Sequence, residues 1–291
     1  MKEGQGKNSI FRIDEKRSNM SEIKSILNYP GSKRKMAKIL AKKMPPHDTY
    51  LEPFAGSLAM LFQKEPAIKE TVNDLDSRVV NLFRVIRDHP EELERLVDLT
   101  PFSREEYENS YTVNPDPLED ARLFLIRCWM AIGAKTSDIT GWRSCIAPNS
   151  PDTPKQWSSI PGRIKPIMER LKSVQIENQD AIKLIDRYNR PYVFIYADPP
   201  YPLSTRSNRH YANEMTDSDH EELLDILKQH VGPVWLSSYE NDLYNNTLHG
   251  WHKEYYDMTT EAGQKRIEVI YMNEVARKAF VAESPTQSKL F

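Results

Sequence analysis

The sequence predicts an α/β fold in which a doubly wound sheet is interrupted by a long, mainly helical insertion. Short apolar strand patterns alternate with helical patterns before residue 88 and again after residue 175. Such alternation predicts parallel strands joined by right-handed crossovers. The chain has 291 residues, which is enough for one large domain or for a core domain with an insertion.

The composition is that of a globular protein with a very wet surface. Hydrophobic residues at 39% can build a core, while 28% of residues are charged. With a formal net charge of -2, the protein as a whole does not attract polyanions electrostatically. Binding of nucleic acid therefore needs a local basic surface. No apolar run approaches membrane-spanning length and the N-terminus lacks a secretory signal, so we expect a cytoplasmic protein without a membrane partner.

Neither the cysteines nor the histidines form a metal-binding pattern. Cys128 and Cys145 lack the paired spacing of a zinc site or a disulfide framework, and we expect both to be reduced packing residues. His249 and His252 lie three residues apart, with no further cluster of metal-ligand character. The sequence therefore predicts no metal site.

Residues 1–22 are polar and mixed in charge, and we expect them to form a mobile tail before the first elements. The expected elements are a turn at 28–33, an amphipathic helix at 33–44, a strand with a tight turn at 49–57, a helix at 58–62, a strand at 70–76 and a helix at 77–89. Strand and helix alternate here as the predicted fold requires.

The middle of the chain, residues 88–175, has a different pattern. Helices are expected at 91–100, 103–111 and 118–132, and a long irregular stretch at 133–166. Loops of that length inside compact domains tend to be functional or disordered. Alternation resumes at residue 173, with a strand and helix to 188, a strand at 192–196, a helix at 217–230 and strands at 231–239, 251–258 and 266–273.

The strand at 192–196 ends abruptly in Asp198-Pro199-Pro200-Tyr201. Proline cannot donate to a strand ladder and favours an extended preceding residue, so Asp198 is held at the carboxyl end of the strand. Ligands bind at that edge of open α/β sheets. The alternative is a rigid loop whose acid caps the next element.

The turns after the first two strands predict a ligand that lies across the same edge. Gly56 allows close backbone approach, yet neither phosphate-binding glycine pattern is present, so the ligand need not carry phosphate. Asp74 stands where doubly wound folds place an acid on a ribose hydroxyl. Its alternative role is the N-cap of the following helix. The combination implies a ligand with ribose but without phosphate.

The ordered motifs of the chain resemble the Dam-like DNA adenine N6-methyltransferases, which form the D12 class. The motifs are NYPGSK (28–33), LEPFAGS (51–57), VNDLD (72–76), ADPPY (197–201) and PVWLSSYEND (233–242). Their order, with the catalytic motif after the insertion, is that of the alpha group. Where the family often has a second glycine after Gly56, this chain has Ser57-Leu58-Ala59.

The resemblance implies a Rossmann-like mixed sheet of the S-adenosylmethionine-dependent methyltransferase type with an inserted target-recognition domain. Residues 23–87 and 176–280 would form the catalytic domain, 88–175 the target-recognition region, and 281–291 a loose C-terminal tail. The cofactor would be S-adenosyl-L-methionine. The residues that stand where the family binds it are Tyr29, Lys33, Pro53, Phe54, Gly56, Asp74, Asp180 and Asp198.

The resemblance assigns catalysis to Asp198, Pro199, Pro200 and Tyr201. Adenine N6 is a poor nucleophile because its lone pair is delocalised into the ring. An ionised Asp198 and a proline carbonyl accept but cannot donate, so together they can hold both N6 hydrogens and orient the lone pair. Tyr201 would stack on a base flipped out of the duplex, which offsets part of the cost of unpairing.

A basic, aromatic-bearing region predicts the contact with double-stranded DNA. Its basic residues are Arg143, Lys155, Arg163, Lys165, Arg170 and Lys172, with Trp142 and Trp157 among them. The alternative is a solvated surface whose tryptophans cover the core. Arg206, Arg209 and His210 could contact phosphates or form a mobile loop. Ser237 and Ser238 could line the adenine pocket or form a turn.

Three functions fit these patterns, and we favour a site-specific DNA adenine N6-methyltransferase. The same acceptor pair would serve another exocyclic amine, at cytosine N4 or in RNA, and a non-catalytic DNA-binding module could keep the fold. A companion restriction endonuclease, the recognition sequence and the oligomeric state are left open by the sequence.

Overall fold

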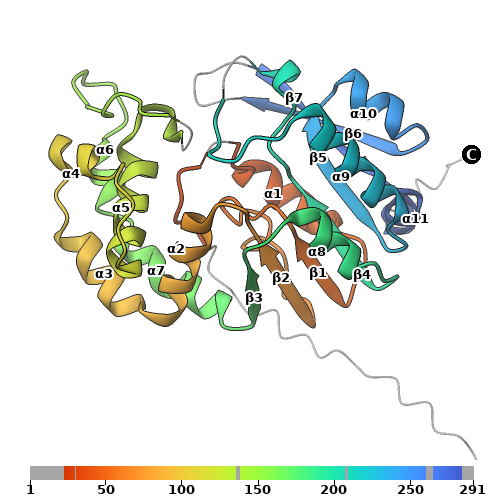
Figure 1. The fold of residues 1–291 in the computed structure, drawn as a ribbon, viewed down its shortest axis with the longest axis horizontal. Helices are drawn as coiled ribbons and strands as arrows, with labels where there is room; N and C mark the ends of the chain where they lie inside the picture. The colour runs from red at the N-terminus through yellow and green to blue at the C-terminus, as the bar shows by residue number, and fades with distance from the viewer. Residues whose placement is uncertain (1–22, 30, 136–137, 207–208, 260–264, 284–291) are drawn as a thin grey trace, which may run out of the picture.

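The computed structural model describes residues 23–29, 31–135, 138–206, 209–259 and 265–283. Within them the strands form a seven-stranded mixed sheet (Figure 1). The strands are β1 Thr49–Glu52, β2 Lys69–Asn73, β3 Val174–Glu177, β4 Val193–Ala197, β5 Val234–Tyr239, β6 His252–Thr259 and β7 Lys265–Met272. Their order is β3-β2-β1-β4-β5-β7-β6. The first five are parallel, and β7 is antiparallel to both of its neighbours. The mixed α/β sheet predicted from the sequence is confirmed.

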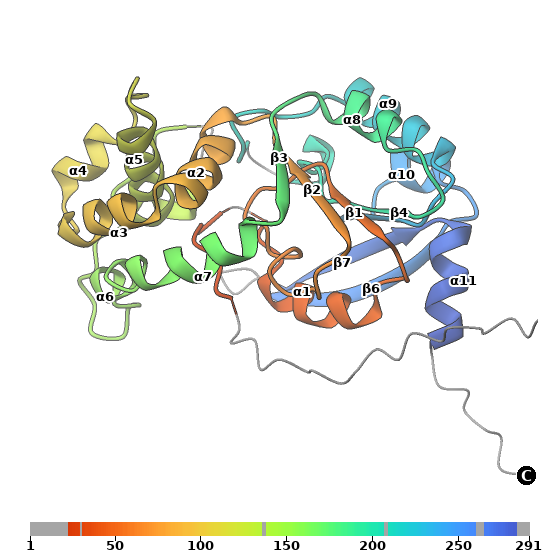
Figure 2. The ribbon, with the colours of Figure 1, turned by 90° about the horizontal axis from the view of Figure 1, so that it is seen from below.

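Helices cover both faces of the sheet. Helices α8 (Ala181–Arg187), α9 (Asp217–Gln229) and α10 (Asp242–Thr247) lie on one face, and α1 (Arg34–Leu40) and α11 (Glu274–Glu283) lie on the other (Figure 2). Alternate strand residues point to opposite faces. Tyr50 therefore joins the core cluster under α1, whereas Leu51 joins the cluster under α8 and α9. All five residues of β4 are buried, as expected for a central parallel strand.

The inserted segment forms a helical lobe at the β3 side of the sheet (Figures 1 and 2). It follows α2, which joins it to the sheet. The bounds of these helices are α2 Ser77–Asp88, α3 Pro90–Leu99, α4 Arg104–Asn109, α5 Pro117–Met130, α6 Thr153–Trp157 and α7 Pro161–Leu171. Helix α5 packs on α2, and α7 packs on α2 and α3 before the chain enters β3.

Two of the expected elements are wrong. Residues 58–62 form hydrogen-bonded turns instead of a helix, because Leu58 has a φ of +55° and leaves the right-handed helical path. The stretch 133–166, expected to be irregular, contains α6 and the start of α7. Pro154 and Pro161 stand in the first turns of α6 and α7, where proline is compatible with a helix, and Pro166 lies inside α7.

The expected tail at 1–22 and most of the tail at 281–291 lie outside the described residues, while α11 extends to Glu283. Cys128 is buried as expected, but Cys145 is exposed, so its expected packing role is wrong. Within the described residues, the helices are too short or too polar to cross a membrane.

A buried ion cluster fixes the end of the insertion to the sheet. Glu70 of β2 accepts hydrogen bonds from Lys64 and from Arg170 of α7, each at 2.5 Å, and all three side chains are buried. Arg170 therefore does not belong to the basic DNA-facing surface on which it was expected. Removing one partner of such a cluster would leave a buried charge unpaired, so the three residues act as a structural unit.

Candidate active site

A cavity lies at the carboxyl edge of the sheet, where β1, β2 and β4 end. It is lined by residues from five separate segments, which are Tyr29, Gly31, Ser32, Lys33, Glu52, Phe54, Ala55, Gly56, Ser57, Ala59, Met60, Asp74, Leu75, Asp76, Tyr196, Asp198, Pro200 and residues 211–215. The parallel topology thus brings residues 29–33, 52–60, 74–76 and 196–200 to one site, as the sequence predicted for the edge of a doubly wound sheet.

Asp74 connects the first two strand ends. Its two carboxylate oxygens accept from the backbone N–H groups of Gly56 and Asp76, each at 2.9 Å. Gly56 has a φ of +46°, and a Cβ there would lie 3.4 Å from the ring of Tyr29, so the turn favours glycine. The alternative that Asp74 caps the following helix is wrong, because Asp76 accepts from Arg78 N–H and is the N-cap of α2.

Lys33 is the cation beside Asp198. Its ammonium lies 3.4 Å from Asp198 Oδ1 and 3.6 Å from Glu268 Oε1, and it donates to the carbonyl of Gly31 at 2.9 Å. The Lys33 side chain is 5% exposed. Burial acts to lower the Lys33 pKa, but Asp198 and Glu268 together raise it above its usual value. Lys33 therefore stays charged inside the site.

Tyr201 is held tightly behind Asp198. It is 8% exposed, donates its hydroxyl to Glu268 Oε2 at 2.5 Å and lies 2.8 Å from Ser237 Oγ. The Lys33 ammonium sits over its ring at 4.5 Å, and the ring of Tyr239 packs against it at 4.8 Å between centroids. A base can stack on Tyr201 only after neighbouring side chains move.

Three acids in the cavity have raised pKa values. Burial raises the pKa of Asp198 to about 6, against the lowering effect of Lys33. Burial also raises the pKa of Asp74 to about 6, although the N–H groups of Gly56 and Asp76 lower it. Burial brings the pKa of Glu52 to about 8. Near neutral pH, Asp198 is therefore an ionised acceptor while Glu52 is mostly a protonated donor.

Most of the predicted cofactor residues lie at this cavity. Tyr29, Lys33, Phe54, Gly56, Asp74 and Asp198 line it, as does Pro200 of the catalytic motif. Pro53 and Asp180 are not among the lining residues. Pro53 is buried, with its carbonyl accepting from Asn73, and Asp180 is exposed and caps α8. Pro199 is buried beside Asp198.

Further residues of the site were not predicted from the sequence. Glu52 at the end of β1 and Tyr196 near the end of β4 line the cavity, and so does Tyr211 from the loop before α9. Glu268 reaches the same site from β7. A charged residue inside an apolar strand pattern, as in Arg266-Ile267-Glu268-Val269, is the signal that could have identified Glu268.

The four predicted DNA-binding residues divide into two kinds. Lys155 and Lys165 are exposed. Arg143 and Arg163 are half-buried, and Arg163 donates to the carbonyl of Ser25. Of the neighbouring aromatic residues, Trp157 is buried and donates to a backbone carbonyl, and Trp142 packs on the ring of Phe102.

The loop after the catalytic motif also has a structural function. Arg206 pairs with Glu214 and donates to the carbonyl of Tyr201, whereas Arg209 is exposed. Ser237 and Ser238 are fully buried. In the described part of the chain, no group of three or more histidine, cysteine or acidic side chains could hold a metal ion.

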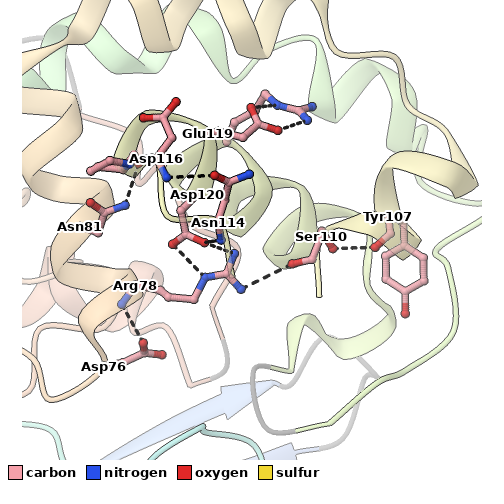
Figure 3. Close-up of polar contacts among 11 residues, drawn as sticks. Asp76, Arg78, Asn81, Tyr107, Ser110, Asn114, Asp116, Glu119 and Asp120 are labelled. Atoms are coloured by element: carbon pink, nitrogen blue, oxygen red, sulfur yellow. Dashed lines mark hydrogen bonds and ion pairs between the residues drawn. The ribbon is translucent and has the colours of Figure 1, made fainter. Parts of the chain in front are cut away.

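A polar network links the cavity to the insertion (Figure 3). Asp76, which lines the cavity, caps α2 through the backbone of Arg78, and the Arg78 guanidinium pairs with Asp120 of α5 at 3.1 Å. Arg78 lies within 3.5 Å of the carbonyl of Ser110 as well. Asn81, one turn further along α2, donates to the carbonyl of Pro117. The first turns of α2 thus contact both the cavity and the insertion.

Known proteins similar to this chain include a curated methyltransferase. A curated Type II methyltransferase, M1.LlaDCHI of Lactococcus lactis subsp. cremoris, is 26% identical over 227 residues, which cover 72% of this chain and 78% of the relative. Among solved structures, a putative RNA methyltransferase from Pyrococcus horikoshii has a TM-score of 0.36 and 9% identity, over 87% of this chain and 90% of that one. A putative methyltransferase from Escherichia coli has a TM-score of 0.35 and 11% identity, over 83% and 84%. Residues 29–262 match the D12 class N6 adenine-specific DNA methyltransferase family, and the chain belongs to that family.

Proposed function

We propose that the protein transfers the methyl group of S-adenosylmethionine to N6 of an adenine flipped out of double-stranded DNA. The observation that carries the proposal is the position of Asp198. This half-buried acceptor, whose side chain is 20% exposed, stands just after β4 and lines the same cavity as Gly56 and Asp74. Asp198, proposed to hold the target amine, and Asp74, proposed to hold a ribose, therefore line one cavity. Direct methyl transfer requires the two bound molecules to lie this close together.

The chemistry of the cavity fits S-adenosylmethionine. Asp74 is an acceptor suited to ribose hydroxyls, and the turn at Gly56 brings backbone close to the cavity. Phe54 and Leu75 add apolar surface for a purine ring. We propose that these residues, with Tyr29 and Lys33, hold the cofactor. When bound, it supplies an electrophilic sulfonium methyl group.

The residues of the catalytic motif prepare the target amine. An ionised Asp198 accepts one N6 hydrogen, and a carbonyl of the Pro199-Pro200 pair accepts the other, which favours a pyramidal nitrogen with an available lone pair. Because a carboxylate with a pKa of about 6 is mostly ionised at neutral pH, Asp198 can act as an acceptor there. We propose that Tyr201 stacks on the flipped base once its neighbours have moved.

Replacement of Asp198 by asparagine tests the proposal. The amide keeps the shape of the side chain but can present a donor to N6, so methyl transfer is expected to fall at least about 100-fold. Folding is expected to persist, because Glu268 still faces the Lys33 ammonium. The assay follows a labelled methyl group from S-adenosylmethionine into duplex DNA, with product nucleosides identified by mass spectrometry.

The matched control is Asp225→Asn, which changes an exposed aspartate on α9 that pairs with Lys228. Its rate is expected to equal that of the wild type. Substantial activity in folded Asp198→Asn would contradict the acceptor role. Label found only in RNA, or as N4-methylcytosine, would contradict the proposed substrate. A cytoplasmic location and a companion restriction endonuclease are further proposals, the latter supported by the name of the Type II relative.

A further inference from the structure

We propose that Glu268 of β7 is a positioning residue of the methyl-transfer site, which fixes Tyr201 and shares the Lys33 ammonium with Asp198. This inference rests on the proposed function. Glu268 lies beyond residues 29–262, the part of the chain that matches the family. It is also absent from the residues that line the cavity, so it would act through its neighbours.

The two oxygens of Glu268 serve two different partners. Oε2 accepts the Tyr201 hydroxyl at 2.5 Å, and Oε1 faces the Lys33 ammonium at 3.6 Å. The residue is 6% exposed, so both interactions occur away from bulk water. Burying a carboxylate is costly unless it is paired and hydrogen-bonded. Tyr201 and Lys33 meet this requirement, and Glu268 in turn fixes where both side chains lie.

Sharing of Lys33 matters for the acceptor. A lysine paired with Asp198 alone would compete with the target amine for the same carboxylate. Here the ammonium lies at similar distances from Asp198 Oδ1 and Glu268 Oε1, 3.4 and 3.6 Å. Lys33 therefore balances two carboxylates, and the group of three carries one net negative charge when both acids are ionised. That charge favours a cationic methyl donor near the site.

The pH dependence of transfer reports this arrangement. Several titratable groups interact electrostatically with Asp198, so that each shifts its pKa or has its own pKa shifted by it. These groups are Lys33, Glu52, Tyr196, Tyr201, Tyr211, Tyr239, Tyr244 and Glu268. The pKa values of the tyrosines are raised, and the pKa of Glu52 is about 8, so these groups are mostly neutral near pH 6. The remaining members of this group are Lys33, which is charged, and Glu268, which raises the pKa of Asp198.

The test is the pH profile of methyl transfer in Glu268→Gln, at saturating S-adenosylmethionine so that titration of Asp74 does not limit the rate. In the wild type, the rate is expected to fall as Asp198 is protonated. Glutamine keeps an acceptor for Tyr201 but removes the negative charge that raises the Asp198 pKa. The acidic limb is therefore expected to move to lower pH, with a loss of less than about 10-fold at the plateau.

A second variant separates positioning from charge. Glu268→Ala also removes the acceptor for the Tyr201 hydroxyl, so its plateau rate is expected to fall about 100-fold, the scale of a misplaced reacting group. The control Glu274→Gln removes a charge just after β7, where the side chain is 62% exposed, and is expected to keep the wild-type profile. Stability of each variant is followed by urea unfolding.

The outcomes are distinguishable. If the acidic limb of the pH–rate profile moves to lower pH in Glu268→Gln, the result supports the proposal. If that limb stays where it is or moves to higher pH, the proposal is overturned, whether or not Glu268→Ala folds. A folded Glu268→Ala with wild-type rate also overturns it. If the wild-type protein transfers no methyl group to DNA adenine, the proposed function fails first, and this result is separate from any effect of Glu268.

Discussion

Asp74 is the residue whose role the structure narrows most. Sequence alone left it as either a ligand for ribose or a helix cap, and Asp76 performs the capping. Asp74 instead spans two strand ends, with one oxygen on the Gly56 N–H and the other on the Asp76 N–H. It therefore holds the turn after β1 against the turn after β2 and lines the cavity with the same carboxylate.

Asp74→Asn is expected to weaken cofactor binding with little effect on the transfer step. The neutral amide has one acceptor oxygen in place of two, so one of the two N–H groups loses its acceptor and a ribose hydroxyl loses a charged one. A hydrogen bond to a charged group contributes about 1.5 to 3 kcal/mol, which corresponds to roughly 10- to 100-fold in affinity. Isothermal titration calorimetry with S-adenosylmethionine measures the affinity. The KM and kcat show whether the variant affects binding or the transfer step.

The control for Asp74 is Asp186→Asn, an exposed aspartate on α8. Its affinity is expected to equal that of the wild type. A drop in kcat with unchanged affinity in Asp74→Asn would place that side chain in the transfer step and contradict the binding role.

Site residues could be predicted where function lies in a short local pattern. Asp198 and Asp74 follow recognisable strands, and Gly56 stands in the turn after β1, so their place at one sheet edge follows from parallel topology. Glu52 and Glu268 were missed for a physical reason. Their roles depend on contacts with distant residues, such as Lys33 and Glu268, which are 235 positions apart in sequence and meet only after β7 inserts beside β5.

Among the elements, those with clear amphipathic or strand periodicity could be predicted, and those with mixed signals could not. Helix α7 was missed because prolines and a glycine obscured its buried stripe of Ile160, Ile164, Ile167 and Leu171. The segment 58–62 was read as a helix because it is apolar throughout. Its burial on every side reflects a packed turn, which periodicity cannot distinguish from a buried helix.

Helix α2 connects the insertion to the cavity at the sheet edge, and its second residue, Arg78, makes the contact with the insertion (Figure 3). Arg78→Ala would leave the Asp120 carboxylate, whose side chain is 7% exposed, without its cation. Breaking a buried pair in this way costs about 3 to 5 kcal/mol. Urea unfolding is expected to report a loss of that size in the free energy of unfolding.

The matched control lies on the same helix. Arg87 pairs with Asp88 at 2.7 Å, but both side chains are largely open to water, so Arg87→Ala is expected to cost less than about 1 kcal/mol. Equal losses in the two variants would show that the Arg78–Asp120 pair does not join α2 to the insertion more strongly than a surface pair does.

At the scale of the whole molecule, the small net negative charge makes DNA binding a property of a local surface. The basic residues predicted from the sequence differ in exposure and in their protein partners. Arg170 is buried in an ion cluster, and Arg163 is drawn to the carbonyl of Ser25, so these side chains already have protein partners. Lys155 and Lys165 are the exposed pair among the four predicted DNA-binding residues. We therefore expect these two lysines to carry the phosphate contacts of the region.

The double variant Lys155→Ala, Lys165→Ala tests this surface through the salt dependence of DNA binding. Each phosphate contact contributes about 0.9 to the slope of log affinity against log salt concentration, so the slope is expected to decrease by about 2. Affinity should weaken similarly for any duplex sequence, because phosphate contacts carry no sequence information. Fluorescence anisotropy with a labelled duplex between about 50 and 200 mM salt gives the slope.

The control is Lys228→Ala, which changes an exposed lysine on α9 and should leave the slope unchanged. An unchanged slope in the double variant would move the DNA-contacting surface away from α6 and α7.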